Sequence, residues 1–190
     1  MKQGSVEKLL LGAALSLGVA AGVAAAANTS PSVYTDSEIA QKAAHEIRMY
    51  SRYTIWDNVN LRVNNGNVEL LGQVSQPFKK SDLQRVMRHV PGVESVTNDL
   101  KVLPLSPFDD RLRLQVARAL YRDPVLSRYS IQAIPPIHII VDNGHVTLEG
   151  VVNTDMEKEV AGVRANSSGL SFGTVTNNLR VENPSKAQKG

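Results

Sequence analysis

Arginines that recur at helical spacing in one short segment are the side chains of this chain best suited to chemistry. Arg111, Arg118 and Arg122 follow a Ser-Pro pair at residues 106–107, which is a typical helix start. At about 100° per residue, these arginines and Gln115 fall within roughly 60° of arc on one helix face. Positive charges gathered in this way attract anionic groups, so the segment predicts a surface that binds anions.

Two less polar side chains flank this arginine stripe. Leu114 and Tyr121 lie beside it, on the side away from the residues that we expect to be buried. Charges that attract headgroups, next to apolar groups that enter the boundary, are what a helix at a membrane interface needs. The alternative is a solvated face, with Arg111 paired to Asp110 or Asp123 and with the apolar side chains packed against another domain. The expected buried stripe consists of Leu112, Val116, Ala119 and Leu120.

No pattern in the sequence indicates catalysis or a metal site. The pair Asp109-Asp110 fits the first turn of a helix better than acid–base chemistry, and no Gly-x-Ser-x-Gly motif is present. The histidines lack ligand spacing, although His138 and His145 flank a predicted hairpin turn and could approach each other across it. We therefore expect no catalytic residue, no metal, no cofactor and no small-molecule substrate. The four histidines are His45, His89, His138 and His145.

The N-terminus has the parts of a secretory signal peptide. Lys2 and Lys8 flank the start of an uncharged apolar run, and Ala25 and Ala27 supply small residues before a cleavage point ahead of Asn28. We predict a signal peptide at 1–27 and a flexible linker at 28–35. The alternative is an uncleaved anchor.

Composition narrows the choice of partner. Cleavage at this point removes two of 21 basic and one of 18 acidic side chains, and a net charge of +2 is low for a nucleic-acid-binding protein. The chain has no cysteine, which excludes disulfides, zinc thiolate sites and thiol nucleophiles. It also lacks the cysteine that carries lipid in a lipoprotein.

The sequence after residue 35 repeats itself. Residues 59–74 and 137–152 match through an Asn-Gly turn, and the pattern Val-x-Asn-x-Leu-x-Val closes both copies, at 96–102 and at 175–181. Two copies of about 70 residues are too few for a solenoid, so they indicate two tandem domains. The predicted boundaries are 36–104 for the first domain, 105–183 for the second and 184–190 for a disordered tail.

Each copy has the periodicity of helix, strand, strand, helix, strand. Thr35 with Glu38, and Thr154 with Glu157, form capping boxes at helix starts. The expected fold class is α+β: two αββαβ domains, each a three-stranded sheet packed against two helices. Trp56, between the first helix and the hairpin, is expected in the core, with an exposed anchor as the alternative. The predicted ranges are 79–90 for the second helix and 93–102 for the last strand of the first copy, and 172–181 for the last strand of the second.

Glycines mark the hairpins of both copies. Gly66 and Gly144 follow asparagine in two-residue turns that require positive φ. Gly72 and Gly150 are expected to end the return strands, where the backbone bends. The second copy is several residues longer around 130–136, so the copies are not interchangeable there.

These features resemble the BON domain family. The resemblance rests on the Asn-Gly hairpin that ends at Gly72 or Gly150, on the closing Val-x-Asn-x-Leu-x-Val, and on the Pro-Gly-Val at residues 91–93. The second copy departs from it at residues 167–172, where another sequence replaces Pro-Gly-Val. The resemblance covers residues 36–104 and 109–183.

The resemblance implies an exported, often periplasmic envelope protein that binds phospholipid membranes and takes part in osmotic or envelope stress responses. It also implies that the first helix of the second domain can contact the membrane. We therefore predict a non-catalytic periplasmic protein that binds an anionic phospholipid surface. The alternative is a module that docks an envelope protein, and salt dependence separates the two. The predicted contact residues are Arg111, Leu114, Arg118, Tyr121 and Arg122.

Overall fold

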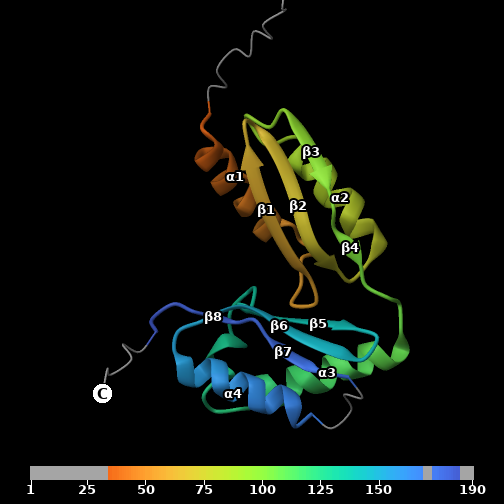
Figure 1. The fold of residues 1–190 in the computed structure, drawn as a ribbon, viewed down its shortest axis with the longest axis vertical. Coiled ribbons are helices and arrows are strands. Elements are labelled where there is room, and N and C mark those ends of the chain that lie inside the picture. The colour runs from red at the N-terminus through yellow and green to blue at the C-terminus, as the bar shows by residue number, and fades with distance from the viewer. Residues whose placement is uncertain (1–33, 169–172, 185–190) are drawn as a thin grey trace, which may run out of the picture. The chain divides into compact units, whose positions relative to one another are not determined.

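The computed structural model describes residues 34–168 and 173–184. The predicted signal peptide lies outside the described residues, as do most of the predicted linker, the predicted strand start at Phe172 and most of the tail. The described residues form two copies of one element order, and in each copy two helices cover one face of a sheet (Figure 1). The predicted α+β class is confirmed.

The first copy contains two helices and four strand segments. They are α1 (Asp36–Met49), β1 (Asn58–Asn64), β2 (Asn67–Val74), α2 (Pro77–Met87), β3 (Ser95–Asn98) and β4 (Lys101–Val102). The second copy has the same order with a short 3-10 turn, η1, added after its first helix. Its elements are α3 (Pro107–Tyr121), η1 (Ser127–Tyr129), β5 (Ile137–Asp142), β6 (His145–Val152), α4 (Asp155–Asn166), β7 (Val175–Asn177) and β8 (Arg180–Val181).

The last strand of each copy is interrupted, so the predicted third strand appears as two segments. In the first copy β1 and β2 pair antiparallel, and both β3 and β4 pair parallel with β2. At the break, the N–H of Leu100 donates to Oδ1 of Asn98 at 3.3 Å, and the side chain of Leu100 is buried. The second copy repeats this break with Asn177 and Leu179. The closing motif thus interrupts the strand and turns its leucine into the core.

Each hairpin turn is held by a carboxylate from the first helix of its own copy. Asn65 and Gly66 both have positive φ, as a type I′ turn requires. Their N–H groups donate to Asp36 at 2.8 and 2.9 Å. In the second copy Asp109, which is buried, accepts the corresponding two N–H groups at 3.0 and 2.9 Å. Asp109 therefore fastens the hairpin turn to α3, a role beyond the helix capping that the sequence suggested.

Two local predictions differ from the structure. Helix α2 begins two residues before the predicted range of 79–90, because Pro77 occupies the first helical position, where its missing N–H costs nothing, and it ends at Met87, three residues before the predicted end. Gly72 and Gly150 lie inside β2 and β6 and do not end them. A Cβ at Gly72 would lie 2.1 Å from the carbonyl oxygen of Asn58, and one at Gly150 would lie 1.9 Å from that of Pro136. Close backbone approach is the reason for glycine at both sites.

Each copy has its own hydrophobic core, and residues 32–190 form one compact unit. Trp56 was expected in a core, and it packs, half-buried, against the core cluster of the second copy. Beside it the N–H of Ile139 donates to the carbonyl of Ile55 at 2.7 Å. The connection that follows α1 therefore belongs to the first copy in sequence but also contacts the second. The buried residues of the first core are Ile39, Ala43, Ile47, Val68, Leu70, Val74, Leu83, Met87, Val90 and Leu100.

Candidate functional site

Helix α3 forms because its start is capped and its apolar residues fall on one side. The hydroxyl of Ser106 accepts from the N–H of Asp109 at 3.3 Å, and a proline occupies the first turn. Leu112, Val116 and Leu120 are fully buried, as the spacing predicts, whereas Ala119 of the expected stripe is only half-buried. Three such side chains, each contributing about 1.5–3 kcal/mol on burial, fix which side of α3 faces the core.

The opposite side of α3 carries the predicted arginines. Arg111, Arg118 and Arg122 are exposed, and Leu114 between them is 48% exposed. Among the described residues, none of these three arginines forms an ion pair. Arg111, Leu114, Arg118 and Arg122 follow one another at intervals of three or four residues, which keeps their side chains on one face of the helix. We call this surface, formed by Arg111, Leu114, Arg118 and Arg122, the arginine face.

The carboxylates that the sequence offered as partners for Arg111 are engaged elsewhere. Asp110 pairs with Arg113 at 2.5 Å, and Asp123 pairs with Arg164 at 2.6 Å. Arg113 is itself buried and donates to the carbonyl of Val141 at 2.8 Å. Sequence reasoning missed Arg113, although it lies three residues before Val116 and seven before Leu120, on the buried side of the helix.

Tyr121 does not lie with the other four predicted contact residues. Its ring packs against the core of the second copy, and its hydroxyl donates to the carbonyl of Ile137 at 2.9 Å. Burial raises the pKa of this hydroxyl. A side chain held in this way is not free to enter a bilayer, so the proposal below rests on the other four residues.

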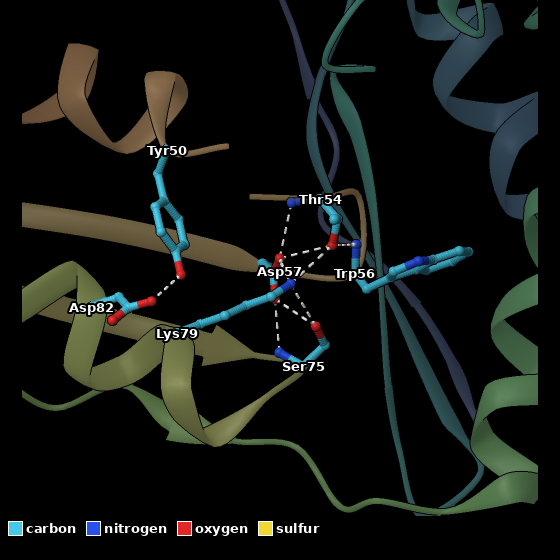
Figure 2. A network of polar contacts seen from close by, with 7 residues as sticks. All are labelled: Tyr50, Thr54, Trp56, Asp57, Ser75, Lys79 and Asp82. Carbon is cyan, nitrogen blue, oxygen red and sulfur yellow. Dashed lines mark hydrogen bonds and ion pairs between the residues drawn. The ribbon is translucent and has the colours of Figure 1, made fainter. Parts of the chain in front are cut away.

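The connection that carries Trp56 also supplies one partner of a buried ion pair, Asp57 (Figure 2). Asp57 is fully buried and accepts from the N–H of Ser75 at 2.7 Å and from Nζ of Lys79 at 2.6 Å. It also accepts from the N–H of Thr54 at 2.9 Å. Burial by itself raises the pKa of Asp57, but the hydrogen bonds from Lys79, Ser75 and Thr54 outweigh it and hold this pKa below its ordinary value. The ionised carboxylate thus fixes the turn before β1, while the indole of Trp56 points away from it (Figure 2).

In the second copy, the residue equivalent to Lys79 is buried as well, but it carries a negative charge. Glu157 occupies the position that matches Lys79 when the copies are aligned on their strand glycines. It is buried and accepts from the hydroxyl of Tyr129 and from the N–H of Asn153, both at 2.9 Å. Arg128, from η1, which has no counterpart in the first copy, forms its ion pair. The buried charge at the start of the second helix therefore has partners in both copies, but the partner residues differ.

His138 and His145 do not come together. The β5–β6 register pairs His138 with Glu149 and His145 with Asp142, which puts the two histidines at opposite ends of the hairpin. The two histidines therefore do not approach each other across the turn. His138 instead packs against the ring of Tyr53, with a centroid separation of 5.4 Å, and burial lowers its pKa. In residues 34–168 and 173–184, no cluster of three or more acidic, histidine or cysteine residues is arranged to hold a metal ion.

Comparison with known proteins identifies the family. The BON domain profile matches residues 35–104 and 108–183, most of the chain, and the chain belongs to this family. The outer membrane lipoprotein DolP of Haemophilus influenzae is 27% identical over 173 residues, which cover 88% of this chain and 84% of that protein. In the part of the chain that the structure describes, no helix has the length and hydrophobicity to cross a bilayer.

Two solved structures of CdsD, a structural protein of the type III secretion system of Chlamydia trachomatis, were also found. One is 14% identical, with a TM-score of 0.26, and covers 77% of this chain and 92% of its own. The other, the C-terminal domain, is 13% identical, with a TM-score of 0.28, and covers 78% and 99%. Similarity this low supports no inference about function.

Proposed function

We propose that this chain is a non-catalytic protein of the bacterial envelope that binds the surface of anionic phospholipid membranes through the arginine face of α3. Export to the periplasm, with cleavage after residue 27, is part of this proposal. Its role is in envelope maintenance or in protection against osmotic and other stress. The DolP relative, by its name an outer membrane lipoprotein, supports the location, and BON domain membership supports the same class of protein.

The observation that carries the proposal is a set of exposed arginines around an exposed leucine, and these arginines have no carboxylate partner among the described residues. Each basic residue close to an anionic surface contributes about 1 kcal/mol to binding. Arg111, Arg118 and Arg122 together therefore contribute about 3 kcal/mol, which is weak and sensitive to salt. Leu114 adds an apolar group that can enter the headgroup boundary, and it is 48% exposed before binding.

Co-sedimentation with vesicles tests the proposal. The chain from residue 28 onward contains the whole compact unit of residues 32–190. We expect it to bind phosphatidylglycerol-containing vesicles at low salt, to bind pure phosphatidylcholine vesicles much less, and to dissociate as salt rises. Replacing all three arginines of the arginine face with serine should abolish the binding.

A matched control separates this face from bulk charge. Arg62, Arg85 and Arg88 are exposed in the first copy, and their triple serine variant lowers the net charge by the same three units. It should keep most of the vesicle binding, whereas equal losses in both triple variants would refute the arginine face as the contact surface. Leu114→Ser should weaken binding more than Met156→Ser, which removes an exposed apolar side chain from α4.

A second candidate function is docking to an envelope protein, and the exposure of one apolar residue supports it. Ile131 is 85% exposed and belongs to the segment that only the second copy has. An apolar side chain so exposed is typical of a protein contact when neighbouring apolar groups complete the patch. If the chain binds no vesicle under any condition, crosslinking in the envelope through residue 131 is the test of this function.

A further inference from the structure

A cavity of about 360 Å³ opens where the C-terminal ends of α3 and α4 meet. Arg118 and Arg122 line it from α3 and its cap, and Arg164 and Ser167 line it from the end of α4. Its volume lies at the small end of the range for ligand sites, about 300–1,000 Å³. The cavity therefore suits a compact polar group.

The charges around this cavity are strongly unbalanced. Three guanidinium groups face it, and Asp123 is the one carboxylate among its lining residues. Asp123 is buried, and the N–H of Val125 and the guanidinium of Arg164 both hold its pKa below the ordinary value. The lining thus carries a formal charge of +2, partly offset by the negative ends of the two helix dipoles, roughly half a charge each, and the remaining positive charge favours a phosphate anion.

The donors needed to hold such an anion are available. Arg164 uses Nε to reach Asp123 at 2.6 Å, which orients its guanidinium, and no described residue is bonded to its terminal nitrogens. Arg118 and Arg122 have no ion-pair partner in the described ranges 34–168 and 173–184. Guanidinium groups present parallel N–H donors that match the oxygens of a phosphate.

We propose that the cavity lined by Arg118, Arg122 and Arg164 binds the phosphate group of an anionic lipid headgroup, with a preference for a phosphate monoester. This inference rests on the proposed membrane binding, because Arg118 and Arg122 belong to both the cavity and the arginine face. A lipid is favoured over a free phosphate compound because these two arginines also lie on the exposed face that the proposed function sets against the membrane. Asp123 acts as a positioning residue for Arg164.

Vesicle binding by single variants tests the cavity. Phosphatidylcholine vesicles with phosphatidic acid, a monoester, are compared with vesicles whose phosphatidylglycerol content is set to equal surface charge. We expect tighter binding to phosphatidic acid, and a loss of roughly tenfold or more for Arg118→Ser and for Arg164→Ser, because each removes a charge-assisted contact. Arg111→Ser, on the same helix but outside the cavity, should cost about fivefold or less.

Two comparisons between variants exclude a folding defect. Arg164→Ser leaves Asp123 buried without its partner, so Arg118→Ser, which breaks no ion pair among the described residues, must show the same loss. Arg164→Lys keeps the charge without the planar donors and should lie between wild type and Arg164→Ser. Equal effects of Arg111→Ser, Arg118→Ser and Arg164→Ser on the two kinds of vesicle would overturn the cavity and leave the arginine face intact.

Inorganic phosphate distinguishes the two sources of the ligand. Titration with phosphate, followed by the NMR signals of arginine Nε–H groups, should shift the signal of Arg164 and should compete with phosphatidic acid vesicles. Saturable phosphate binding by a chain that binds no vesicle would assign the cavity to a free phosphate compound and overturn the lipid assignment. A chain that binds neither would contradict the cavity and the proposed function together.

Discussion

Replacing Lys79 with methionine tests whether the buried ion pair supports the first copy. The ammonium of Lys79 lies 2.6 Å from Asp57, and the two side chains are 6% and 0% exposed. It also donates to the hydroxyls of Ser75 at 2.9 Å and Thr54 at 3.3 Å. Removing one partner of a buried pair leaves the other charge uncompensated, which costs about 3–5 kcal/mol. We expect Lys79→Met to lower the free energy of unfolding by that amount.

Urea denaturation measures this loss, and an exposed ion pair supplies the control. Arg62 pairs with Glu69 at 3.5 Å, and its side chain is 74% exposed. Arg62→Met should therefore change the free energy of unfolding by less than about 1 kcal/mol. The double variant Asp57→Asn with Lys79→Met should lose less than the sum of its single variants, because neither then leaves a buried charge alone.

The effect of Lys79→Met should also depend on pH in a defined direction. In the wild type the pKa of Asp57 is lowered, so its stabilisation is present above the ordinary value near 3.8 and is lost as the pH falls through the folded-state pKa. Without Lys79, burial raises this pKa, and the variant avoids the buried charge by taking up a proton. The difference from wild type should therefore shrink as the pH falls from about 7 to about 4. A difference below about 1 kcal/mol at neutral pH, or one that grows on acidification, would refute this account of the pair.

Four further substitutions probe other contacts, each followed by thermal or urea denaturation. Gly72→Ala should destabilise more than Gly144→Ala, because a Cβ at Gly72 would lie 2.1 Å from a carbonyl oxygen, whereas one at Gly144 meets only a side-chain atom at 3.5 Å; equal losses would contradict this. Asp109→Ala should cost about 2 kcal/mol or more, since it leaves two N–H groups of the hairpin turn without their acceptor, and a loss within error of zero would show that water replaces it. Burial lowers the pKa of His138 below its unfolded value of 6.5, so stability should fall as the pH drops through that value, and His138→Gln should flatten the fall; an unchanged pH profile would rule this histidine out as its source.

The sequence by itself predicted the architecture because its signals are local. The Asn-Gly turns, the capping boxes and the alternation of apolar residues each depend on a few neighbouring residues, and the structure has the helices and strands in the predicted order. Repetition strengthened every such prediction, since each signal occurs twice. The same periodicity placed Arg111, Leu114, Arg118 and Arg122 on one face of α3, because the position of a residue around a helix follows from its number alone.

Tertiary structure decided which polar residues meet. Lys79 reads as an ordinary first-turn residue, and only the approach of the connection before β1 brings Asp57 to it. Arg164 is 42 positions beyond Arg122, and the packing of α4 against α3 alone brings both to one cavity. Tyr121 lies close to the arginine face by helical angle, but its hydroxyl reaches a backbone carbonyl of β5. Such contacts join residues far apart in the chain, so their energies depend on packing that no local pattern encodes.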